Sequence, residues 1–153
     1  MQSKISIHPS LNQFHDIKKI AVGLALFHDT GYYPDFMGHY GQFENNAQAM
    51  ASNINKMHIA LYSQDMTLKT WQRRNGHNRT ADNFVIYTEH FLHDRYFHIL
   101  AVLSPEAYKR INSLLPNYIT QAEQFHRLNK ESLNALLYFT NTNEIERLFS
   151  VTP

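Results

Sequence analysis

The sequence predicts an α+β domain in which helices pack on one face of an antiparallel sheet of three to four strands, with an extra C-terminal helix. Two apolar segments, 84–89 and 96–103, flank a short polar stretch and indicate a β-hairpin. Apolar residues with helical spacing precede Gly31 and return after Ser104. Because 153 residues can bury one core comfortably but not two, we expect residues 1–153 to form a single domain.

The first half of the chain can be assigned from its spacing and its turn residues. Ser10 and Gln13 form a capping-box pattern ahead of a helix that should end near Gly31. Four further segments are expected before the hairpin: an ordered loop at 31–42, a short helix at 47–53, a strand at 57–62 and a long polar connection at 63–83.

The second half of the chain predicts helices. Ser104 can cap a helix that has Pro105 in its first position, and Pro116 should break this helix into two pieces. The tail, residues 130–153, carries apolar residues with helical spacing and predicts a C-terminal helical extension. Because an isolated helix of this length is marginal in water, the tail should dock either on its own domain or between two copies of the chain.

Composition excludes several classes of protein. The chain has no cysteine, so neither a disulfide framework nor a cysteine metal site can form. The longest apolar run, 20–27, is too short to span a bilayer. The formal net charge of +1 excludes a polycation, and we expect a cytoplasmic protein with no membrane partner.

One stretch of the long connection is strongly basic. Residues 66–81 contain no acidic residue and four cations: Lys69, Arg73, Arg74 and Arg79. A basic loop on a weakly charged chain is typical of a phosphate-binding surface, and Trp71 within it could stack on an RNA base. The alternative is a solvated loop whose tryptophan is buried in the core.

Arg79 opens a segment, Arg79-Thr80-Ala81-Asp82, that leads into the hairpin. Asp82 could hold the guanidinium by a charge-assisted hydrogen bond. A positioned arginine can stabilise the extra charge of a pentacoordinate phosphate. The alternative is a structural Arg–Asp pair that fixes the loop.

Ten histidines are an unusual number for a chain of this length. His58 lies in a predicted strand, His77 lies in the basic loop, and His98 should point away from the apolar face of its strand. Imidazole titrates near pH 6.5, so it can both take and give a proton. Cleavage of RNA through its own 2′-OH needs a base, an acid and a cation, so we expect no metal and no other cofactor.

A metal site is the competing interpretation of the histidines. His90, His93 and His98 have ligand-like spacings, and Asp94 is adjacent, so a His-rich binding module stays an alternative to an enzyme. The chain has no His-Glu-x-x-His motif, and ligands in a hairpin loop would be poorly held.

Six segments, in order, resemble the YafO family of type II toxin–antitoxin toxins. They are Gly31-x-x-Pro34-Asp35-x-x-Gly38, His58-Ile-x-Leu61, Arg79-Thr80-x-Asp82, Val85-x-Tyr87, Ile99 to Glu106, and Ala122-Glu123-x-Phe125. The resemblance covers residues 10–127 and leaves 130–153 outside it. After Gly38 the family tends to carry Arg-Asp, whereas this chain has His39-Tyr40.

The resemblance implies a fold related to RelE and an mRNA interferase activity. Such an endoribonuclease cuts mRNA, usually on the ribosome, and is silenced by a cognate antitoxin. The resemblance carries over five site residues: His58, Arg79, Thr80, Asp82 and Tyr87. A toxin of the same fold that acts on another target, such as gyrase, is the alternative within this family of folds.

Overall fold

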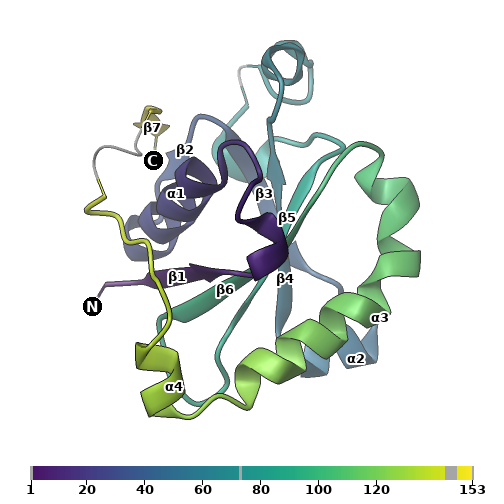
Figure 1. The fold of residues 1–153 in the computed structure, drawn as a ribbon. Helices are drawn as coiled ribbons and strands as arrows, with labels where there is room; N and C mark the ends of the chain where they lie inside the picture. The colour runs from purple at the N-terminus through teal and green to yellow at the C-terminus, as the bar shows by residue number, and fades with distance from the viewer. Residues whose placement is uncertain (1, 73, 144–147, 153) are drawn as a thin grey trace.

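The chain folds around a five-stranded mixed sheet with the strand order β1-β6-β5-β4-β3 (Figure 1). We analysed a computed structural model, which describes residues 2–72, 74–143 and 148–152. The strands are β1 (Lys4–Ile7), β3 (Met37–Gln42), β4 (Ile54–Ile59), β5 (Phe84–Glu89) and β6 (Tyr96–Leu103). β1 is parallel to β6, and the other neighbours are antiparallel. The predicted α+β class and the β5–β6 hairpin are confirmed, whereas the sheet has more strands than expected.

Helices cover both faces of this sheet. α1 (Ile17–Thr30) packs on the face that contains Val85 and Tyr87, whereas α2 (Ala47–Ala51) and α3 (Ala107–His126) pack on the face that contains Phe84 and Ile86. The expectation that the helices gather on one face is wrong for a simple reason. Successive residues of a strand point to opposite faces, and β5 is apolar at both sets of positions, as a strand covered on two sides must be.

The first 42 residues contain three strands that sequence analysis missed, of which β1 is the first. β1 is only four residues long, too short to show a clear alternation of apolar and polar residues. A 3-10 helix at Pro9–Leu11 follows it, so α1 begins later than the capping-box pattern suggested. The predicted end of α1 is confirmed, because Gly31 adopts a left-handed φ of 77° and its N–H bonds Phe27 O.

The expected loop at 31–42 is partly strand. It contains β2 (Tyr33–Pro34) and β3, and β3 pairs with β4 over a register that includes Gln42 and Asn55. Gly38 is required here, because a Cβ at this position would lie 2.4 Å from Arg79 O. The long connection carries two short 3-10 helices, Ser63–Thr67 and Gly76–Asn78, and the second packs against β3.

α3 runs without interruption through Pro116, so the expected break is wrong. A proline inside a helix costs about 3 kcal/mol. Burial of one face against the sheet outweighs this cost, since five side chains of α3 that lie on that face are buried: Ile111, Leu115, Tyr118, Ala122 and Phe125. Ser104 does not cap the helix, because its hydroxyl donates to Asn83 Oδ1.

The described part of the tail packs on its own domain. The expected C-terminal helix is present as the short α4 (Lys130–Asn134), after which Phe139 exchanges two backbone hydrogen bonds with Ile5. Further on, β7 (Val151–Thr152) pairs with β2. Residues 144–147 lie outside the described residues, and the boundaries 10–127 and 130–153 stay predictions.

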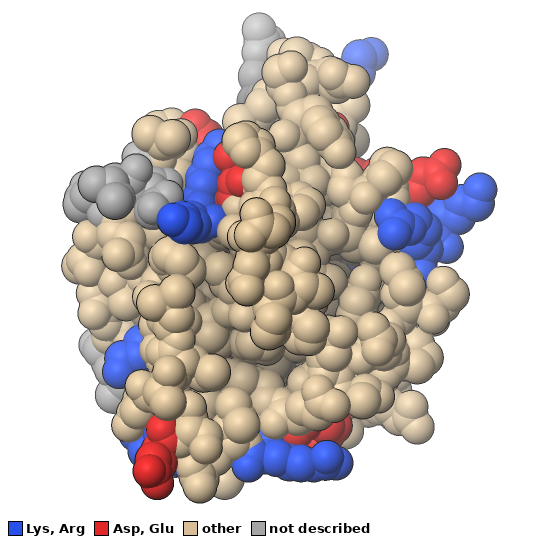
Figure 2. All heavy atoms as spheres, viewed as in Figure 1, with Lys and Arg blue, Asp and Glu red and all other residues tan. Residues whose placement is uncertain are grey.

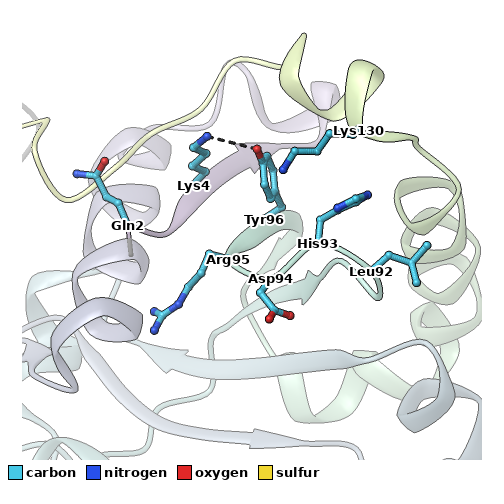
Figure 3. A pocket seen from close by; sticks show the side chains of 8 residues that line it. All are labelled: Gln2, Lys4, Leu92, His93, Asp94, Arg95, Tyr96 and Lys130. Atoms are coloured by element: carbon cyan, nitrogen blue, oxygen red, sulfur yellow. Dashed lines mark hydrogen bonds between the residues drawn. The ribbon is translucent and has the colours of Figure 1, made fainter.

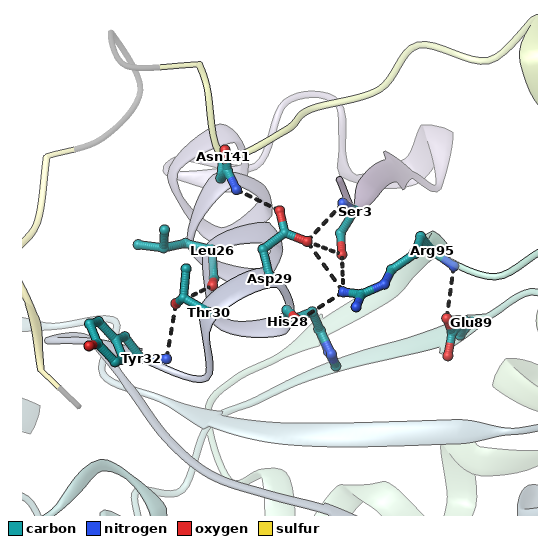
Figure 4. Close-up of polar contacts among 9 residues, drawn as sticks. All are labelled: Ser3, Leu26, His28, Asp29, Thr30, Tyr32, Glu89, Arg95 and Asn141. Carbon is teal, nitrogen blue, oxygen red and sulfur yellow. Dashed lines mark hydrogen bonds and ion pairs between the residues drawn. The ribbon is translucent and has the colours of Figure 1, made fainter. Parts of the chain in front are cut away.

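Asp29 at the end of α1 ties the tail to the rest of the fold (Figure 4). Its Oδ1 accepts from the N–H and hydroxyl of Ser3 at 2.8 and 2.7 Å, and its Oδ2 accepts from Asn141 Nδ2. Arg95 Nη1 lies 3.4 Å from the same carboxylate and donates to His28 O. One carboxylate therefore joins β1, the hairpin loop and the tail.

One face of the molecule carries little charge. On the face shown in Figure 2, charged side chains lie mainly around the rim and leave a broad uncharged area between them. Among the described residues, no helix is both long and apolar enough to cross a membrane.

Candidate active site

A groove of about 660 Å³ lies between the β3–β4 edge of the sheet and the first half of α3. Phe84 lies against it from the sheet, and Ile111 and Leu115 line it from the helix. Five side chains with a titratable or charged group also line it: His39 and Tyr40 from β3, Glu44 from the loop after β3, Lys56 from β4 and Tyr108 from α3. The groove exists because β3 is an edge strand and α3 crosses the sheet beside it.

His58 forms a buried hydrogen-bonded pair with Tyr108. The imidazole is 2% exposed, its Nδ1 lies 2.7 Å from Ala81 O, and its Nε2 lies 3.3 Å from the Tyr108 hydroxyl. Burial lowers the pKa of His58 to about 4, so the ring is neutral at pH 7. Tyr108 is 54% exposed, and burial of its hydroxyl end followed by the charge of Asp82 raises its pKa. A substrate can therefore reach Tyr108 but not His58.

His39 presents an open nitrogen. Its Nδ1 lies 3.0 Å from the backbone oxygen of His77. A carbonyl can only accept, so in the neutral ring Nδ1 carries the proton and Nε2 carries the lone pair. This Nε2 lies over Gly41, where a Cβ would approach it to 3.4 Å. The missing side chain at Gly41 leaves Nε2 accessible.

Lys56 supplies a cation in the same groove. Its Nζ lies 4.9 Å from the Phe43 ring centroid and 5.3 Å from that of Phe84. Partial burial lowers the pKa of Lys56. A partly desolvated ammonium interacts more strongly with a phosphate than one in open water.

Asp82 forms its hydrogen bond with Tyr108 and not with Arg79. Its Oδ1 accepts from the N–H of Tyr108 at 2.8 Å, and its backbone oxygen accepts from the N–H of Ala107. Both bonds satisfy donors at the start of α3, where a carboxylate is also favoured by the helix dipole. The expected Arg79–Asp82 pair is therefore wrong, and Asp82 fixes the beginning of the helix.

Arg79 is buried and does not line the groove. It is 8% exposed, its Nη1 donates to Asp35 O at 3.2 Å, and its guanidinium lies 5.5 Å from the Trp71 ring centroid. Nε and Nη2 have no hydrogen-bond partner among the described residues. Burial lowers the pKa of Arg79, partly offset by Asp35 and Tyr33. In this structure the guanidinium points at backbone and an aromatic ring, not at open solvent.

Only part of the predicted basic surface is free to bind RNA. Trp71 is 4% exposed and donates to Asp35 O, so it belongs to the core and the expected base stacking is wrong. Lys69 and Arg74 are exposed, whereas Arg73 lies outside the described residues. Thr80 exchanges two hydrogen bonds with Thr70, which fixes the end of this loop to its beginning. His77 is exposed, and its backbone oxygen holds His39.

Tyr87 and His98 are not part of the groove. Tyr87 is fully buried under α1, where its hydroxyl bonds His28 Nε2 at 2.8 Å. His98 stacks on Phe125 and bonds the Ser6 hydroxyl at 2.7 Å. Burial lowers the pKa of both His28 and His98 to about 4, and we refer to His28, His58 and His98 together as the buried histidines.

The histidines near the hairpin loop have structural partners. His90 Nε2 lies 3.0 Å from Leu128 O, and His90 and His93 lie side by side with ring centroids 5.0 Å apart. Within the described part of the chain, no group of three His, Cys, Asp or Glu residues has a geometry that could hold a metal ion.

The chain can be placed in a family. The family model described as toxin YafO, type II toxin–antitoxin system, matches residues 25–127, about two thirds of the chain. The protein belongs to this family of toxins. No curated protein and no solved structure matches the chain. The matched region contains the whole groove, from His39 to Leu115.

Sequence analysis brought together only part of this site. None of His58, His77, Arg79, Thr80 and Asp82 lines the groove, but His58 and Asp82 bond Tyr108, and the backbone oxygen of His77 bonds His39. Three residues that line the groove were missed as candidates: His39, Lys56 and Tyr108. In the sequence Tyr108 looks like one more aromatic residue of an amphipathic helix, and only the departure from the family pattern after Gly38 draws attention to His39.

Proposed function

We propose that this toxin is a metal-independent endoribonuclease that cleaves mRNA in the groove between β3, β4 and α3. One observation carries the proposal. His39, Lys56 and Tyr108 line the same groove, and the His39 and Tyr108 rings lie 5.9 and 5.7 Å from the ring of His58. A base, an acid and a cation are thus available around one point, as 2′-OH attack requires.

The reaction follows from these positions. His39 Nε2 takes the proton of the 2′-OH, and the 2′-oxygen forms a bond to phosphorus. The bond from phosphorus to the 5′-oxygen breaks, and the Tyr108 hydroxyl gives its proton to that oxygen. Lys56 stabilises the added charge on the phosphoryl oxygens. The products are a 2′,3′-cyclic phosphate and a 5′-hydroxyl end.

The other predicted residues support this chemistry. The neutral ring of His58 orients the Tyr108 hydroxyl, Asp82 fixes the backbone of Tyr108, and His77 fixes the ring of His39. Arg79 and Thr80 hold the connecting segment against β3 and the basic loop. Lys69 and Arg74 are placed to contact RNA phosphates, on free mRNA or on mRNA held by the ribosome.

The partners and the location follow from the same proposal. Membership in a toxin–antitoxin family implies a cognate antitoxin, which would keep the nuclease silent. Cleavage of mRNA during translation would take place in the cytoplasm.

The decisive experiment is expression of the toxin without its antitoxin, followed by primer extension on an abundant transcript. We expect growth to stop and new 5′ ends to appear. The variant His39→Gln should keep the fold and lose the cleavage, while His15→Gln, at an exposed histidine outside the groove, serves as the matched control. Growth arrest with intact transcripts would refute the proposal and would direct attention to another target, such as gyrase.

A further inference from the structure

A second polar pocket lies at the opposite edge of the sheet from the groove. It has a volume of about 360 Å³ and is formed where β1, the beginning of β6 and α4 meet (Figure 3). Lys4, Tyr96 and Lys130 form its polar wall, and Leu92 and His93 line it from the hairpin loop. None of the residues of the proposed nuclease site lines this pocket.

Two ammonium groups converge on one tyrosine in this pocket. Lys4 Nζ lies 4.9 Å and Lys130 Nζ 4.2 Å from the centroid of the Tyr96 ring, and Lys4 also donates to the Tyr96 hydroxyl at 3.3 Å. The hydroxyl itself donates to Asn134 Oδ1 at 2.7 Å, so its oxygen is left to accept from lysine. Like charges held this close repel each other unless an anion lies between them.

No carboxylate of the described chain neutralises these lysines. The ion pairs found among the described residues join His15 to Asp16 and Arg95 to Asp29, and neither includes Lys4 or Lys130. The Asp94 side chain points away from the two ammonium groups, and the Arg95 guanidinium is turned toward Asp29 (Figure 3). Among the described residues, these two cations have no carboxylate partner, so they are available to an anion of another molecule.

The rim of the pocket indicates what kind of molecule supplies the anion. Leu92, which lines the pocket, is 79% exposed. An exposed apolar side chain beside two cations fits a peptide that carries both a carboxylate and an apolar residue. A nucleic-acid backbone would use the lysines but would gain little from Leu92.

We propose that the Lys4–Tyr96–Lys130 pocket binds a carboxylate of an acidic, apolar-bearing segment of a partner protein, with Leu92 contacting the apolar residue of that segment. The cognate antitoxin that the family implies is one source of such a segment. The proposal does not depend on the nuclease activity, because the pocket and the groove lie at opposite edges of the sheet. Since Lys130 belongs to the tail and Lys4 to β1, binding would also hold the tail in place.

The proposal can be tested with a defined probe and the full-length protein. Isothermal titration would compare an amidated and acetylated peptide of alternating glutamate and leucine with the same peptide carrying glutamine for glutamate. We expect the acidic peptide to bind at least tenfold more tightly, and this preference to disappear in Lys4→Gln/Lys130→Gln. Lys69→Gln, which removes one exposed lysine elsewhere, should bind like the parent, and Leu92→Ser should weaken binding several-fold.

Two results would overturn the proposal. One is equal binding of the acidic and neutral peptides, or no binding of either, by a parent protein shown to be folded. The other is binding of a short RNA that is lost in the double lysine variant while the acidic peptide is unaffected, which would assign the pocket to nucleic acid. The conservative variant Lys4→Arg/Lys130→Arg should retain peptide binding, so loss of charge can be distinguished from loss of fold.

Discussion

The substitution Tyr108→Phe separates the chemistry of the groove from its structure. It removes one hydroxyl, which makes one 3.3 Å hydrogen bond to His58, and keeps the edge-to-face ring contact with Phe84 at 5.0 Å. The substitution leaves Nε2 of the buried His58 without its partner, which costs about 1–3 kcal/mol. For a chain of this size, about 1 kcal/mol corresponds to roughly 3 °C in melting temperature.

The expected effect on cleavage is larger. Loss of a general acid typically lowers the rate by about 10² to 10⁴, which corresponds to roughly 3–5 kcal/mol of transition-state stabilisation. Single-turnover cleavage of a labelled RNA at saturating protein would measure this, together with a thermal melt of the same sample. Tyr118→Phe, in the same helix but deeper in the core, is the matched control. A Tyr108→Phe protein that cleaves within threefold of the parent would refute the assignment of Tyr108 as the acid.

Four further measurements test the rest of the reasoning. Replacing Lys69 and Arg74 by glutamine should weaken RNA binding and flatten its salt dependence without abolishing single-turnover cleavage, and an unchanged salt slope would show that the loop does not contact RNA. Because two guanidinium nitrogens of Arg79 lack partners, Arg79→Met should change the free energy of unfolding by no more than about 1 kcal/mol and cleavage by less than tenfold; a loss above 10² in a folded variant would assign Arg79 to the chemistry. The buried histidines have folded pKa values of about 4, below the ordinary 6.5, so the unfolded chain binds more protons between these values. Stability in urea should therefore be constant above pH 7 and should fall as the pH drops from 6.5 to 4, by at most about 1.4 kcal/mol per pH unit for each of the three rings, and a flat profile would contradict it. Deleting residues 130–153 should lower the melting temperature at every protein concentration, whereas a loss that depends on concentration would indicate a dimer contact.

The parts of the fold that could be predicted are those with strong local signals. The β5–β6 hairpin was predicted with its observed bounds because both strands are rich in β-branched and aromatic residues and are separated by a polar turn. The end of α1 was predicted because Gly31 is the residue that the left-handed C-cap requires. β1 and β3 could not be predicted in the same way, since each is stabilised by pairing with a strand distant in sequence.

The same distinction explains the site. His58 was a good candidate because a polar residue inside an apolar strand needs a partner, and that partner, Tyr108, is 50 residues away. Tyr108 is held beside His58 by Asp82. The sequence suggested that Asp82 pairs with Arg79, whereas in the structure it accepts from the N–H of Tyr108 at the start of α3. The prediction of a break at Pro116 was wrong because helix propensity is a local property. It does not include the burial of one face of α3, which keeps the helix intact.

Two of the segments that resemble the family lie next to the groove residue His39 in the fold. The Gly31–Gly38 and Arg79–Asp82 segments, far apart in sequence, meet where Arg79 O accepts from the N–H of His39 at 2.8 Å and Arg79 Nη1 donates to Asp35 O. Gly38 allows this contact because no larger residue fits against Arg79 O. The hydrogen bond to Arg79 O fixes the backbone position of His39, and the hydrogen bond to the backbone oxygen of His77 fixes the orientation of its ring. On this view a toxin of this family can exchange the side chain at this position, here histidine, while the motifs around it preserve the groove in which we propose that RNA is cleaved.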